Sequence, residues 1–171
     1  MPVTPFKERT DAKVRFARVH LEELKAIPRP LGGDDFDRAH QEAFLFQLLG
    51  ARDCFWAELA ARAGHPPQSM DRITKLRERL KKKGVIIQAI EEIHALAQDK
   101  ASWLRLATDL RNIGTHDRGA SRAYYLGGPW SQKVRLRDPA GPTILTGHFV
   151  DEFEDWHGRM SALVEHYRLK P

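Results

Sequence analysis

The stretch Trp103-Leu104-Arg105-Leu106-Ala107-Thr108-Asp109-Leu110-Arg111-Asn112-Ile113-Gly114-Thr115-His116 decides how the chain is expected to fold. Its apolar residues recur at spacings of three and four, which predicts an amphipathic helix with one buried stripe made of Trp103, Leu106, Ala107, Leu110 and Ile113. Arg111, Asn112 and His116 lie outside this stripe, and Gly114 between them can end the helix.

The same helical spacing recurs along most of the 171 residues and predicts an all-α fold in a single domain spanning 1–171. The expected helices run from about 10 to 27, 35 to 63, 69 to 83, 85 to 97, 102 to 116 and 147 to 167. Thr10, Ser69 and either Asp99 or Ser102 are the expected N-caps. Residues 1–9 contain two prolines and little periodicity, so we expect an extended lead-in there.

Residues 122–146 break the helical pattern and predict a loop followed by a small β-hairpin, inserted before the last helix. Residues 133–137 alternate between basic and apolar side chains, 138–142 are rich in proline and glycine, and 143–146 follow as the second short strand. Because the strands are short, we expect the hairpin to be an addition to a helical body.

Composition limits the cellular compartment and the kinds of partner that we expect for this chain. A single cysteine, Cys54, excludes an internal disulfide, and no apolar run approaches the roughly 18 residues of a membrane-spanning helix. We therefore expect a soluble, cytoplasmic protein. The net charge of +5 is matched by residues 69–83 alone, which hold seven basic and two acidic side chains. That segment is either a solvated surface helix or a phosphate-contacting face.

Arg111 and His116 are five residues apart, which corresponds to about 500° of rotation on a continuous helix and separates the two side chains by about 140°. For both to reach one phosphate, either the helix ends near Gly114 or two copies of the motif meet from two chains. Asn112 and His116, four residues apart, share a face. No His-Glu-x-x-His or Cys-x-x-Cys spacing occurs, so we expect no metal and no cofactor.

Arg-Asn-x-x-x-His at the end of an apolar helix, in a small all-helical protein, resembles the HEPN superfamily (higher eukaryotes and prokaryotes nucleotide-binding domains). The motif falls on Arg111, Asn112 and His116, and the helix pattern matches loosely over 10–167. The resemblance implies an up-and-down bundle of four to five main helices and a homodimer that brings the motif together across its interface. It also implies metal-independent cleavage of single-stranded RNA, as in toxin–antitoxin and phage-defence systems, with a cognate antitoxin as a further partner.

The chemistry of these side chains fits RNA cleavage by the 2′-hydroxyl, which DNA lacks. His116 is the candidate acid or base, Arg111 holds the phosphate and Asn112 positions them. Further basic residues can extend the RNA-binding surface: Arg105, Arg118, Arg122, Lys133, Arg135 and Arg137.

Three other interpretations stay open. The motif can be structural, with Arg111 paired to Asp109 or another carboxylate and His116 capping the helix. The protein can be a non-catalytic HEPN-like module that binds a nucleotide, RNA or a protein. It can also be a DNA-binding regulator that uses residues 69–83, although no clear helix-turn-helix accompanies them.

Overall fold

The computed structural model describes residues 4–26, 35–67, 73–116, 121–123, 135–137 and 148–169. Its elements are α1 (Thr4–Ala26), α2 (Asp35–Arg62), α3 (Ile73–Lys82), α4 (Gln88–Gln98), α5 (Trp103–His116), β1 (Ser121–Ala123), β2 (Arg135–Arg137) and α6 (Phe149–Leu169). The predicted all-α class is confirmed: six helices lie in these ranges, as the apolar periodicity predicts, whereas the resemblance implied four to five main helices.

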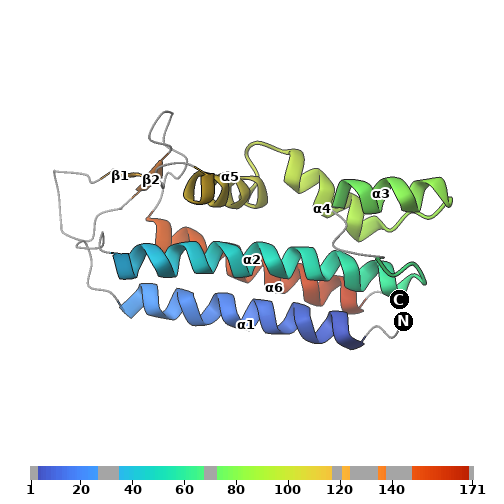
Figure 1. The fold of residues 1–171 in the computed structure, drawn as a ribbon, viewed down its shortest axis with the longest axis horizontal. Helices are drawn as coiled ribbons and strands as arrows, with labels where there is room; N and C mark the ends of the chain where they lie inside the picture. The colour runs from blue at the N-terminus through green and yellow to red at the C-terminus, as the bar shows by residue number, and fades with distance from the viewer. Residues whose placement is uncertain are drawn as a thin grey trace.

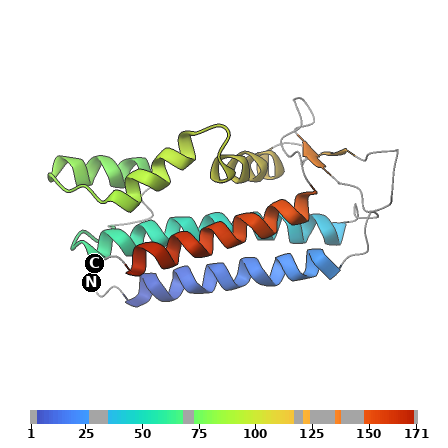
Figure 2. The same cartoon turned by 180° about the vertical axis from the view of Figure 1, so that it is seen from behind.

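Helix α2 is the centre of the arrangement. It packs against α1 and α6, which also pack against each other, so the three long helices form a bundle (Figures 1 and 2). Helices α4 and α5 pack against another side of α2, and α3 packs against α4. The last helix therefore returns to the first two, after the shorter helices have covered α2.

The hydrophobic core lies where these helices meet. Because α2 has neighbours on several sides, its apolar side chains are buried around much of its circumference. They include Phe44, Leu45, Leu48, Leu49, Ala51, Phe55, Trp56, Leu59 and Ala60. Phe44 stacks on Phe153 of α6 with 4.5 Å between the ring centroids. No helix in the described ranges combines the length and the apolar character needed to cross a membrane.

A partly buried ionic network ties the three long helices together near the start of α1 and the end of α6. Arg168 donates through Nε and Nη2 to the two carboxylate oxygens of Glu58 at 2.8 and 2.7 Å, and through Nη1 to Asp11 at 2.6 Å. The hydrogen bond to Glu58 raises the pKa of Arg168 above its usual value. Since Glu58 is only 1% exposed, Arg168 supplies the hydrogen bonds and the counter-charge that water cannot supply there.

Helix α1 begins at Thr4, so the expected extended lead-in is wrong for residues 4–9, while residues 1–3 lie outside the described part. Pro5 lies in the first turn, where a missing backbone N–H leaves no helical hydrogen bond unmade and the fixed φ suits the helix. Thr10, the expected N-cap, lies inside α1 instead and donates its hydroxyl to the backbone oxygen of Phe6.

Glycines end α2 and α3. Gly64 and Gly84 have φ of +77° and +69°, a left-handed conformation that glycine adopts without steric cost. After α3, the backbone N–H of Gly84 donates to the backbone oxygen of Lys81 at 2.9 Å, and that of Val85 donates to the backbone oxygen of Leu80 at 3.0 Å. The helix expected over 85–97 therefore begins only at Gln88, because residues 85–87 form the connection between α3 and α4. Ser69, the expected cap of α3, lies outside the described residues.

The strands β1 and β2 pair antiparallel, with Arg122 opposite Leu136. Strand β2 falls within the first strand of the expected hairpin, at 133–137, but its partner in the structure is β1 rather than residues 143–146. Residues 143–146 lie outside the described ranges, so the pairing expected there stays a prediction.

Candidate functional site

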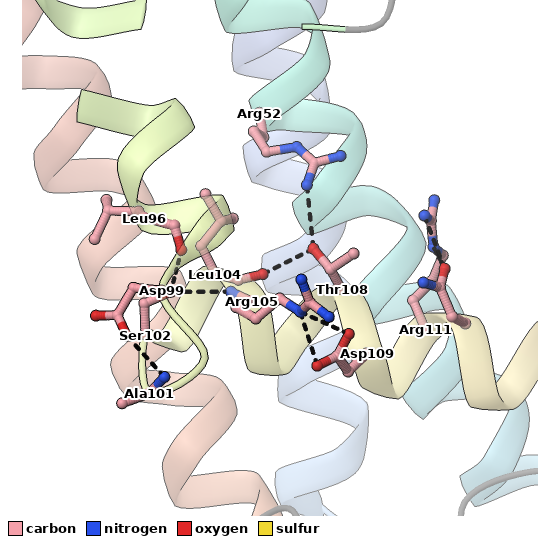
Figure 3. Close-up of polar contacts among 11 residues, drawn as sticks. Arg52, Leu96, Asp99, Ala101, Ser102, Leu104, Arg105, Thr108, Asp109 and Arg111 are labelled. Atoms are coloured by element: carbon pink, nitrogen blue, oxygen red, sulfur yellow. Dashed lines mark hydrogen bonds and ion pairs between the residues drawn. The ribbon is translucent and has the colours of Figure 1, made fainter. Parts of the chain in front are cut away.

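Helix α5 begins at a side-chain cap supplied by Ser102. The hydroxyl oxygen of Ser102 accepts a hydrogen bond from the backbone N–H of Arg105 at 3.1 Å, and the hydroxyl donates to the backbone oxygen of Leu96 at the end of α4 (Figure 3). Asp99, the other expected cap, accepts instead from the N–H of Ala101 at 2.9 Å. The prediction of a cap at Ser102 is confirmed, and this residue fixes the angle between α4 and α5.

The buried face of α5 differs from the predicted stripe at one position. Leu104 is 1% exposed and belongs to the core, whereas Leu106 is only half-buried. The other predicted members, Trp103, Ala107, Leu110 and Ile113, are buried as expected. The stripe is therefore rotated slightly, because Leu104 lies against neighbouring helices.

Arg111 and Asn112 lie together outside this core face. Arg111 donates through Nε and Nη2 to the Oδ1 of Asn112, at 3.2 and 3.1 Å (Figure 3). The side chain of Asn112 is exposed and that of Arg111 is half-buried. The amide oxygen of Asn112 thus accepts two hydrogen bonds from the guanidinium group, and the positioning role expected for Asn112 stays a prediction.

The helix does not end at Gly114. Helix α5 continues to His116, so the expected break at Gly114 is wrong. The backbone of the motif stays helical to its last residue, and apolar residues anchor the turn that precedes it. On a continuous helix Arg111 and His116 are about 140° apart around the axis, so one copy of α5 does not bring them together. The side chain of His116 lies outside the described part of the structure.

Arg105, a predicted RNA-binding residue, has a partner on its own helix. Its Nε donates to both oxygens of Asp109, at 2.9 and 3.0 Å, one helical turn further on (Figure 3). Asp109, which was one expected partner for Arg111, thus pairs with Arg105. This exposed pair reduces the positive potential that Arg105 can offer to a phosphate.

Three of the remaining predicted RNA-binding residues lie on the strand pair. Arg122 lies on β1, and Arg135 and Arg137 lie on β2, where the pairing places Arg122 in register between them. Arg118 and Lys133 lie outside the described residues. The backbone pairing thus places Arg122 beside residues that are 13 to 15 positions further along the sequence.

Sequence reasoning missed Arg52 of α2. This residue is almost fully buried and donates through Nη1 to the hydroxyl of Thr108 on α5 at 3.2 Å (Figure 3). Its guanidinium carbon lies 4.7 Å from the ring centroid of Trp56. Its Nη2 is also 2.8 Å from Asp53. A lone arginine inside the apolar run of α2 was the available signal, since arginine is rarely buried without partners. Arg52 holds α5 against α2 one turn before Arg111.

Two further observations complete the description of the site. Within the described ranges, no group of three or more histidine, cysteine, aspartate or glutamate side chains is arranged to hold a metal ion. Comparison with known proteins finds no match to a family model, a curated protein or a solved structure.

Proposed function

We propose that this chain is a metal-independent endoribonuclease of the HEPN type, similar in its action to toxin and phage-defence ribonucleases, and that it cleaves single-stranded RNA as a homodimer. The observation that carries the proposal is the Arg111–Asn112 pair, which lies outside the core on a helix that continues to His116. In this proposal α1, α2, α5 and α6 make up the up-and-down bundle, and residues 122–146 are an insertion.

The continuity of α5 supports a site composed from two chains. One chain presents Arg111 and His116 about 140° apart around the helix axis. Two copies of α5 that meet across a two-fold axis place the arginine of one chain beside the histidine of the other. Such a dimer also holds two imidazoles, so one can be neutral while the other is protonated.

The proposed reaction needs a base, an acid and a cation. The imidazole of His116 removes the proton from the 2′-hydroxyl, whose oxygen attacks the adjacent phosphorus. The bond to the 5′-oxygen breaks, and that oxygen receives a proton from the second imidazole, which leaves a 2′,3′-cyclic phosphate. The planar guanidinium of Arg111 binds the phosphoryl oxygens as negative charge builds up, and Asn112 keeps it in place.

Cleavage of labelled single-stranded RNA in the presence of EDTA tests the proposal. The wild-type protein should produce fragments with 2′,3′-cyclic phosphate ends and leave DNA of the same sequence intact. His116→Ala should lower the rate by about 10²–10⁴-fold, the range of acid–base catalysis. His94→Ala and Arg159→Ala are matched controls on α4 and α6 and should keep full activity. Intact RNA, or a His116→Ala protein as active as the wild type, contradicts the proposal.

A mixing experiment tests the composite site separately. Arg111→Ala and His116→Ala should each be inactive, but mixed dimers hold one intact arginine and one intact histidine at the interface. Activity in the mixture above that of either variant is expected from a two-chain site, and it should stay below the wild-type rate because water has to replace the second imidazole as the acid. Light scattering that shows a monomer at micromolar concentration would argue against it. RNA bound by a wild-type dimer without cleavage would favour the non-catalytic binding module.

A further inference from the structure

The outer face of α3 carries a group of lysines that the proposed cleavage site does not use. Helix α3 turns Ile73, Leu76 and Leu80 into the core. Lys75 and Lys82 of α3 and Lys83, which directly follows its end, are exposed, and we refer to these three as the basic face. On a helix, Lys75 and Lys82 are about 20° apart around the axis and about 10.5 Å apart along it, so they point to the same side.

The charges beside the basic face are already paired with protein groups. On the flank toward α4, Arg77 binds Glu91 through Nε and Nη2 at 2.7 and 2.6 Å, and Lys81 lies 3.7 Å from Glu91. The hydrogen bond from Arg77 lowers the pKa of Glu91, which therefore stays ionised. On the other flank, Arg79 donates to the backbone oxygen of Pro66 at 3.4 Å.

The basic face itself has no such partner among the described residues. No ion pair joins Lys75, Lys82 or Lys83 to a carboxylate in those ranges, and Glu78 is the one acidic side chain between Ile73 and Gly84. Three lysines against one glutamate give a local positive potential. A ligand that carries several negative charges in a row complements this arrangement.

The packing of α3 distinguishes between the possible polyanions. A helix that binds a membrane surface must insert its apolar side, and the apolar side of α3 is occupied by the core of the protein. A nucleic-acid strand needs only the lysines, because it presents a line of phosphates to the outside of the helix. The proposed activity makes single-stranded RNA the relevant strand.

We infer that the basic face of α3 binds the phosphate backbone of single-stranded RNA at a second contact, apart from the cleavage site on α5. Helix α3 lies toward the end of the molecule opposite the strand pair, while α5 lies between them (Figures 1 and 2). A long RNA can therefore touch both places, whereas a short one cannot. The choice of RNA rests on the proposed function, but binding at α3 does not depend on cleavage.

The test measures the affinity of His116→Ala protein for fluorescent single-stranded RNA, so that the RNA stays intact. Lys75→Glu and Lys82→Glu together remove two phosphate contacts. The slope of log affinity against log salt should decrease by about 1.4, which corresponds to about 25-fold weaker binding at roughly 0.1 M salt. Glu78→Lys should tighten binding. Arg15→Glu with Arg38→Glu makes the same charge change on exposed positions of α1 and α2 and should have a much smaller effect.

Two results would overturn the inference. One is equal weakening by the α3 pair and the control pair, provided that both show the circular dichroism spectrum of the parent. If either charge-reversed protein is unfolded, Lys75→Gln with Lys82→Gln replaces it in the same measurement. The other is an α3 variant that no longer binds anionic vesicles but keeps the RNA affinity of the parent.

The experiment also separates this inference from the proposed activity. If the wild type cleaves RNA and the α3 variants bind as tightly as the controls, only the inference about α3 fails. If the wild type does not cleave but the α3 variants lose RNA affinity, the nuclease proposal fails and the second contact stands.

Discussion

Removal of Arg168 should destabilise the protein far more than an ordinary surface substitution. Both oxygens of Glu58, which is 1% exposed, receive hydrogen bonds from this one side chain. Arg168→Met leaves a buried carboxylate without its counter-charge, a change that costs about 3–5 kcal/mol in free energy of unfolding. For a chain of this length the expected decrease in Tm is roughly 6–20 °C.

The measurement is urea unfolding followed by tryptophan fluorescence, because Trp56, Trp103 and Trp156 are all buried. The double variant Glu58→Leu with Arg168→Met serves as the control, since it removes both charges and should recover most of the lost stability. Asp11→Ala, at the exposed side of the network, should cost less than about 1 kcal/mol. A loss below about 1 kcal/mol for Arg168→Met alone, or a double variant no more stable than the single one, would refute this reasoning.

Three further predictions concern stability. Gly84→Ala should cost about 1–2 kcal/mol in denaturant unfolding, because its φ of +69° strains any residue with a Cβ; an unchanged midpoint would contradict this. Ser102→Ala should cost about 1 kcal/mol by removing the cap of α5, and Ser102→Thr, which keeps a hydroxyl that can accept from Arg105 and donate to Leu96, should restore most of it. Burial and the nearby His40 lower the pKa of His20, whose Nδ1 lies 3.2 Å from that of His40. Stability should therefore be complete above pH about 6.5 and fall below it until the lowered folded pKa is reached, and His20→Gln should flatten that fall in thermal unfolding.

The periodicity of apolar residues predicted the helices because each is held by one or more buried faces. It failed where local conformation, rather than hydrophobicity, decides. Pro5 suggested an extended start, but a proline in the first turn is compatible with α1. Residues 85–87 continue the apolar pattern, yet Gly84 in the left-handed conformation has already ended α3. Leu104 replaces Leu106 in the core because neighbouring helices determine which side of α5 is covered.

The candidate site was predictable to the extent that it is local. Arg111 and Asn112 are adjacent in the sequence, and their contact follows from that. Arg52 was missed because its contact with Thr108 joins residues 56 positions apart, which no local pattern records. Similarly, the charge of α3 is visible in the sequence. Only the packing of α3 on α4 shows that Glu91 pairs with Arg77 and not with the lysines on the outer side of α3.

The return of α6 to α1 determines when this protein can finish folding during its synthesis. Arg18 and Glu154 are 136 residues apart in the sequence, and Asp11 and Arg168 are 157 apart. Helices α1 and α2 can pair as soon as the ribosome releases them, but Phe44 stays without Phe153 until α6 has emerged. We expect the nascent chain to expose this apolar surface throughout most of translation. We expect chaperones that recognise apolar segments to bind the nascent chain until α6 has emerged.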